Sequence, residues 1–191
     1  MVFESHPLQP FLPSNGRILF LGSFPPPRAR WSMDFFYPNW INDFWRVMGF
    51  IHFDNAQHFV VEGEKRFDKG RIMEFCLSQG LGFYDAAIRV CRMKDNASDD
   101  HLEIVKPTDI SVLLSRMPQC HDIVTTGGKA SDELQRQLQM MMPKIGEYIE
   151  GEAFGRNLRW WRMPSTSRAY PLKLEKKATY YARLFSLLRT S

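Results

Sequence analysis

Four short apolar runs, separated by helical patterns, are the feature of this sequence that most restricts its fold. The runs cover residues 17–22, 81–86, 122–126 and 158–163 and are typical of buried strands. Strands that alternate with helices are joined by crossovers, and such crossovers produce a mostly parallel sheet covered on both faces. The sequence therefore predicts an α/β fold. Helices are predicted at 42–50, 68–79 and 107–117, after the glycine turn at 127–128, and at 173–188.

The length of the chain and its polar segments set the expected domain organisation. A chain of 191 residues with 44% hydrophobic content can form one domain with a substantial core. We predict a single domain over residues 1–191. Residues 92–106 are polar, have no periodicity and are expected to form a surface loop. The lysines of the C-terminal helix, including Lys176 and Lys177, are expected on a solvent-exposed face.

The sequence gives no support for a disulfide-rich, zinc-binding, secreted or membrane-spanning protein. The three cysteines form neither an even disulfide set nor a CxxC pair, and the five histidines lack the spacing of a zinc site. A net charge of +4 permits an anionic partner without requiring one. The first residues do not follow the pattern of a signal peptide, and no apolar run approaches the length of a membrane span. We therefore expect a cytoplasmic protein.

Residues 21–50 form an unusual connection, because they contain three consecutive prolines and nine aromatic side chains. A long loop costs ordering entropy, and chains rarely keep one unless it binds or covers something. In open α/β sheets, ligands bind beyond the carboxyl ends of the strands. Here those ends read GSFPPP, YDAA, TTGGKAS and MPSTSRAY, which are rich in small residues with exposed amides suited to phosphate or an extended backbone.

Five segments in order resemble the uracil-DNA glycosylase superfamily, most closely its hypoxanthine-DNA glycosylase branch. They are HPLQPFLPSNGRILFLGSFPP, FYPNWINDFWRVMGF, GLGFYDAA, TTGGKA and MPSTS, and the similarity spans residues 6 to about 188. The resemblance implies a three-layer α/β/α sandwich with a central four-stranded parallel sheet. It also implies hydrolysis of the N-glycosidic bond of a deaminated base in DNA, uracil or hypoxanthine, without metal or cofactor. Strand cleavage is not expected, because no amino nucleophile stands in a recognised motif position. The protein is expected to be a monomer.

The same resemblance assigns roles to individual residues. Asn42 matches the catalytic Asn of that branch, and Tyr37 matches the aromatic residue that stacks on the flipped base. Asp85 lies where relatives have a pyrimidine-reading Asn. The predicted base-binding residues are Gly22, Ser23, Phe24, Tyr37 and Asp85, and the predicted DNA-binding residues are Thr126, Gly127, Lys129, Pro164, Ser165, Thr166, Ser167, Arg168 and Tyr170.

Two of these residues, Asn42 and Asp85, also have an ordinary structural explanation. Asn42 is equally suited to cap the helix that follows it, and Asp85 to hold its own turn. Phe24 replaces an acidic or amide residue that places water in many relatives, and Met163 replaces a His or Asn that steadies the departing base. These two departures favour an alternative function, a non-catalytic protein that binds damaged or distorted duplex. Hydrolysis of free nucleosides is less favoured, because the Ser-Thr-Ser-Arg segment would have no use there.

Overall fold

The computed structural model describes residues 2–92 and 102–189. Its larger sheet is five-stranded with the order β3-β2-β6-β8-β7. Four of these strands are parallel neighbours, and they correspond to the four predicted runs. They are β2 (Ile18–Gly22), β3 (Leu81–Asp85), β6 (Asp122–Thr125) and β8 (Arg156–Arg162).

The fifth strand corrects the prediction of a central four-stranded parallel sheet. Strand β7 (Glu147–Ala153) pairs antiparallel with β8 and forms an edge of the sheet. The turn between them contains Phe154 and Gly155, both with positive φ, as a tight hairpin requires. β7 was not predicted because its sequence, EYIEGEA, has three glutamates and only two large apolar residues, and none of its residues is fully buried.

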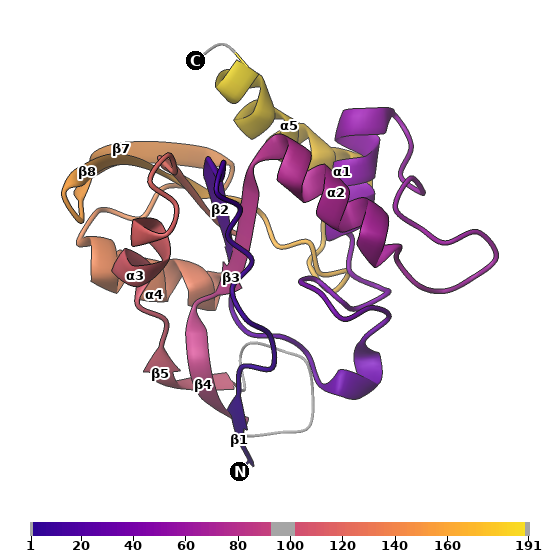
Figure 1. Ribbon diagram of the computed structural model, residues 1–191, viewed down its shortest axis with the longest axis horizontal. Coiled ribbons are helices and arrows are strands. Elements are labelled where there is room, and N and C mark those ends of the chain that lie inside the picture. The colour runs from indigo at the N-terminus through magenta and orange to yellow at the C-terminus, as the bar shows by residue number, and fades with distance from the viewer. Residues whose placement is uncertain (1, 93–101, 190–191) are drawn as a thin grey trace.

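A second, antiparallel sheet was also not predicted. It has the order β1-β4-β5, formed by β1 (Val2–Ser5), β4 (Ala87–Arg92) and β5 (Leu102–Pro107). Strands β4 and β5 occupy the described ends of the segment 92–106, so the prediction of a loop there is wrong for residue 92 and for residues 102–106. Residues 93–101 of that prediction lie outside the described residues. In Figure 1 this small sheet extends from the end of β3, next to the N-terminus.

Helices lie on both sides of the larger sheet. Figure 1 shows α3 and α4 on one side and α1, α2 and α5 on the other. This arrangement buries β2, β3 and β6 completely, as their apolar sequences require. The helices are α1 (Phe44–Phe53), α2 (Lys69–Gln79), α3 (Ile110–Ser115), α4 (Gly128–Leu138) and α5 (Leu174–Arg189), with a short 3₁₀ turn η1 (Arg28–Arg30).

The helix ends follow from local capping chemistry. The Asp68 side chain accepts a hydrogen bond from the Arg71 amide at the start of α2, and Gly80 ends that helix in the predicted left-handed conformation, with φ of 65°. Helix α3 is shorter than predicted because Asp109 caps its start. Within the described residues, no helix is long and apolar enough to cross a membrane.

Candidate active site

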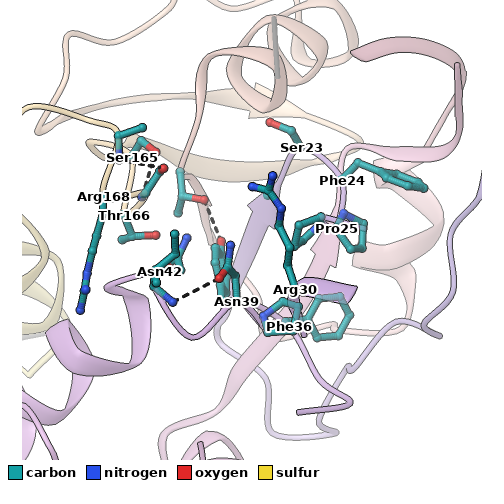
Figure 2. A pocket seen from close by; sticks show the side chains of 18 of the residues that line it. Ser23, Phe24, Pro25, Arg30, Phe36, Asn39, Asn42, Ser165, Thr166 and Arg168 are labelled. Carbon is teal, nitrogen blue, oxygen red and sulfur yellow. Dashed lines mark hydrogen bonds between the residues drawn. The ribbon is translucent and has the colours of Figure 1, made fainter. Parts of the chain in front are cut away.

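A cleft of about 670 Å³ lies at the carboxyl ends of the parallel strands. Its walls come from the segments that follow β2, β3, β6 and β8, as expected for an open α/β sheet. Figure 2 shows Ser23 and Phe24 on one side, Ser165, Thr166 and Arg168 on the other, and Asn39 and Asn42 between them. The predicted site residues that line the cleft are Gly22, Ser23, Phe24, Tyr37, Asn42, Asp85, Thr126, Ser165, Thr166, Ser167, Arg168 and Tyr170. Gly127, Lys129 and Pro164 do not contribute to its lining.

The proline-aromatic loop, residues 23–43, is held in place by hydrogen bonds to its carbonyl groups. The indole of Trp31 donates to Pro26 O at 2.7 Å, and that of Trp45 donates to Phe36 O at 2.9 Å. Arg92, on the small sheet, donates to Pro25 O at 3.1 Å. Because these donors are fixed by packing, the loop forms an ordered wall of the cleft.

Tyr37 lies at the centre of this wall in a strained backbone conformation. Its φ of 51° is unusual for a bulky residue and has an energetic cost of order 1–3 kcal/mol. The ring stacks on Phe44 with centroids 3.9 Å apart, and its hydroxyl shares a 2.7 Å hydrogen bond with Thr126 Oγ1. Burial, together with the nearby Asp85 charge, raises the pKa of Tyr37 well above its ordinary value. Tyr37 is therefore a rigid, neutral aromatic surface in the cleft.

Asn42 lies immediately before helix α1, whose N-cap residue is Asp43. The Asn42 side-chain oxygen accepts a hydrogen bond from the Phe44 amide at 2.9 Å, so Asn42 bonds a first-turn amide as expected, although the N-cap position is Asp43 and not Asn42. Among the described residues, the Asn42 side-chain nitrogen has no hydrogen-bond partner. The carboxamide is thus oriented by the start of the helix, and its NH₂ group remains available as a donor in the cleft.

Asp85, the last residue of β3, is held by a histidine that sequence reasoning did not select. His6 Nε2 lies 2.9 Å from Asp85 Oδ2, and the two side chains are 1% and 11% exposed. At the adjacent end of β2, a Cβ at position 22 would collide with Asp85 Oδ1, so glycine is needed there for the carboxylate to approach. His6 lies in HPLQP, the start of a segment that resembles the glycosylase superfamily. That membership is the only sequence feature that could have indicated His6 as a site residue.

Phe24 lines the cleft, but its ring also packs against the small sheet. It contacts the cluster formed by Ala87, Val90 and Leu102, and it meets the His6 ring edge to face at 5.3 Å. Figure 2 shows the Phe24 ring pointing away from Asn42. Tyr37 is therefore better placed than Phe24 to stack on a bound base.

The Ser-Thr-Ser loop, residues 164–168, is anchored by a buried lysine. Lys177 Nζ donates to Asp43 Oδ2 at 2.9 Å and to Ser167 O at 2.8 Å. Arg168 Nε donates to the other Asp43 oxygen at 3.1 Å, and the Asp43 amide donates to Thr166 O at 2.9 Å. The prediction of a solvent-exposed Lys177 is wrong, because this side chain is 0% exposed and forms an ion pair across the base of the loop.

Two further observations bear on what the cleft can bind. Arg30 is exposed on η1 and lines the cleft, so both walls carry an arginine, Arg30 on one side and Arg168 on the other. In the described part of the chain, no group of three or more His, Cys, Asp or Glu side chains is placed to hold a metal ion. The functional groups that the cleft presents to a ligand are therefore amide, hydroxyl, carboxylate, guanidinium and aromatic groups.

Fold and site together define an α/β protein with an aromatic and polar cleft at the carboxyl edge of its sheet. No family model matches the chain, and a search of curated proteins finds no match. Among solved structures, the chain is similar to the solution NMR structure of a "putative Uracil DNA glycosylase" from Methanosarcina acetivorans. The two chains are 18% identical, the match covers 98% of this chain and 99% of the other, and the TM-score is 0.65. This similarity shows a shared fold.

Proposed function

We propose that this protein is a monofunctional DNA glycosylase that removes a deaminated base, uracil or hypoxanthine, from DNA. The observation that carries the proposal is the convergence of Tyr37, Asn42 and Asp85 on one cleft, facing a loop suited to the DNA backbone. The shared fold with a structure described as a uracil-DNA glycosylase supports the same class. The protein is expected to act as a single domain, as a monomer and in the cytoplasm.

The cleft has the shape and surface needed for an extruded nucleotide. A base within a duplex cannot be attacked, so the nucleotide must leave the stack at a cost of a few kcal/mol. Stacking of a base on an aromatic ring returns about 1–3 kcal/mol. Phe44 covers one face of the Tyr37 ring, so the other face is the surface for the base. The volume of about 670 Å³ leaves room for the sugar and its phosphates beside the base.

Hydrolysis places specific demands on the residues near C1′ of the sugar. A water oxygen bonds to C1′ while the electron pair of the N-glycosidic bond leaves with the base, and the water proton is lost to solvent. Positive charge develops on the sugar and negative charge on the base. The Asn42 NH₂ group can orient the water or donate to the departing base, but a carboxamide cannot take up the proton. A modest rate is therefore expected.

Strand cleavage is not expected, because it would require an amine that forms a covalent intermediate with the sugar. No lysine lines the cleft within the described residues. Lys177, the nearest candidate along the Ser-Thr-Ser loop, is fully buried in its ion pair with Asp43. Ser165, Thr166, Ser167 and the two arginines that line the cleft are instead the proposed contacts to phosphate.

The test is an excision assay on labelled duplexes that each carry one uracil or one hypoxanthine. After incubation, alkali converts abasic sites into strand breaks, so excision appears as a shortened strand only after alkali. Asn42→Ala is expected to lose most of the activity, whereas Asn15→Ala, a variant of an exposed asparagine bonded to Leu77 O, retains it. Absence of product from every deaminated base would overturn the proposal.

A second candidate, a non-catalytic protein that binds damaged duplex, is favoured by the hydrogen bonds of the two polar residues. The Asn42 oxygen is engaged by the Phe44 amide, and the Asp85 carboxylate is engaged by His6. Such a binder would show selective affinity for lesion-containing duplex and no excision in either the wild type or Asn42→Ala.

A further inference from the structure

His6 is a buried, titratable side chain to which the proposed mechanism gives no role. Its Nε2 lies 2.9 Å from Asp85 Oδ2, and its Nδ1 lies 3.1 Å from the Leu8 amide nitrogen, which can only donate. If Nδ1 accepts that bond, the ring proton is on Nε2. In a protonated ring, Nδ1 can donate to Leu8 O at 2.9 Å, and Nε2 still carries a proton. The remaining neutral tautomer would set a bare Nε2 lone pair against the carboxylate oxygen and is disfavoured, so Nε2–H donates to the Asp85 carboxylate.

Packing prevents the imidazole from turning away from Asp85. The His6 ring lies 4.6 Å from the ring of Tyr84 and 5.3 Å from that of Phe24, and its side chain is 1% exposed. A fixed donor on Oδ2 fixes the plane of the carboxylate as well. His6 thereby determines where the second carboxylate oxygen is placed.

That second oxygen is the one that a ligand can use. Asp85 lines the cleft, and in the part of the chain that the structure describes, its Oδ1 makes no hydrogen bond. Oδ1 lies against Gly22, close to the position of the Tyr37 hydroxyl. A carboxylate oxygen with an unused lone pair, buried beside the stacking ring, accepts a hydrogen bond from whatever polar edge enters the cleft.

The geometry points to His6 as a positioning residue that keeps Asp85 a hydrogen-bond acceptor, so that the pair selects bases with a ring N–H beside a carbonyl group. This inference rests on the proposed function, because it takes an extruded base as the occupant of the cleft. Deamination converts the bare N3 of cytosine and the bare N1 of adenine into N–H groups. An acceptor therefore pairs with the deaminated base, while the lone pair of the parent base is repelled.

Three substitutions separate this role from simple packing. His6→Phe keeps an aromatic ring and removes the donor. His6→Gln keeps an N–H donor that can reach the carboxylate. Asp85→Asn, with His6 still donating to the amide oxygen, directs an NH₂ donor into the cleft. His121→Phe is the matched control, because His121 is exposed and precedes β6 at the opposite end of the sheet.

The measurement is a ratio of affinities for paired duplexes, uracil against cytosine and hypoxanthine against adenine. The nucleotide of interest carries a 2′-fluoroarabino sugar, which resists hydrolysis, so that binding is measured without turnover. Loss of one charge-assisted hydrogen bond corresponds to a fall of about 10- to 100-fold in the ratio. We expect this fall in His6→Phe, the wild-type ratio in His6→Gln and His121→Phe, and a reversed preference in Asp85→Asn.

The outcomes distinguish failure of the inference from failure of the proposed function. Excision by the wild type, with a ratio that His6→Phe leaves unchanged, would overturn the inference and leave the glycosylase in place. An equal fall in His6→Gln and His6→Phe would also overturn it, since packing alone would then explain the effect. A His6-dependent ratio without excision from any duplex would support base selection and overturn the glycosylase. If His6→Phe does not fold, His6→Gln and Asp85→Asn still decide the question.

Discussion

At the scale of single residues, Tyr37 is central to the proposed function, because it supplies the stacking surface for the extruded base. Its left-handed backbone is maintained by the stack on Phe44 and by the hydrogen bond to Thr126. Strained residues of this kind persist only where the surrounding structure holds them, and they concentrate at functional sites. The strain therefore supports a role for Tyr37 beyond covering the end of the sheet.

Substitution of Tyr37 separates the contribution of the ring from that of the hydroxyl. Tyr37→Ala is expected to weaken binding to lesion-containing duplex by about 1–3 kcal/mol, because the stacking surface is lost. Tyr37→Phe keeps the ring and is expected to bind almost as well as the wild type. Fluorescence anisotropy with a labelled duplex measures both, and an equal loss in the two variants would contradict stacking as the source of affinity.

Prediction of site residues from the sequence relied on motif positions and could not reveal contacts between segments that are far apart in the chain. Tyr37, Asn42 and Asp85 were proposed from motif positions, and the structure brings all three to the same cleft. His6 and Lys177 were missed as site residues, because their partners lie 79 and 134 positions away in the sequence. A lysine at a polar helix position has no local feature that distinguishes an exposed side chain from one buried against a distant carboxylate.

At the scale of elements, the Ser-Thr-Ser loop depends on helix α5 for its position. Lys177 joins α5 to Asp43 at the start of α1, and it also holds the carbonyl of Ser167. The cleft wall and the start of α1, where Asn42 lies, are therefore connected through one buried ion pair. A change at Lys177 is expected to affect stability and the shape of the cleft together.

Lys177→Met is expected to destabilise the fold by about 1–3 kcal/mol, because Asp43 loses its buried partner and keeps only Arg168, and the Ser167 carbonyl loses its donor. The double variant Asp43→Asn/Lys177→Met is expected to lose less than the sum of the two single changes. Urea denaturation measures each free energy of unfolding. Lys176→Met, at an exposed position of the same helix, is the control and should be neutral. Strict additivity of the two changes would contradict the coupling.

The elements themselves differed in how well the sequence predicted them. Strands β2, β3, β6 and β8 were predicted because central parallel strands are continuous apolar runs. The strands that were missed are in the small sheet or at an edge. In β1, β5 and β7 many residues are exposed or half-buried, so the apolar signal is weak, and β4 is mostly buried but its sequence AIRVCR contains two arginines. The partner of β1 is the distant strand β4, which periodicity along the chain does not reveal.

At the scale of the whole molecule, two phenols make stability depend on alkaline pH, Tyr181 fully buried in the core and Tyr37 half-buried at the cleft. Burial raises the pKa of both Tyr37 and Tyr181 above the ordinary value of 10.0. The folded state thus keeps both phenols protonated at a pH where the unfolded chain ionises them. Their contribution is complete below about pH 10 and decreases as the pH rises further, by about 1.4 kcal/mol per pH unit for each phenol.

Urea denaturation between about pH 9 and 11 tests this dependence. The free energy of unfolding should begin to fall near pH 9, because burial also raises the pKa of the Cys76 and Cys120 thiols above the ordinary value of 9.0. It should fall more steeply above about pH 10, where the phenols add their contribution. Tyr37→Phe removes one of the two phenols and should make the fall shallower. A wild-type free energy of unfolding that did not change over this range would contradict the raised pKa values of these phenols and thiols.

The cleft as a whole is proposed to receive one extruded nucleotide, and fluorescence of 2-aminopurine placed next to the lesion measures that event directly. 2-Aminopurine is quenched within the stack and brightens when its neighbour leaves. We expect wild-type protein and Asn42→Ala to raise the fluorescence of a uracil- or hypoxanthine-containing duplex well above that of a matched undamaged duplex, and Tyr37→Ala to raise it much less. Bound duplex that stayed as dim as free duplex would contradict extrusion, and with it the repair function.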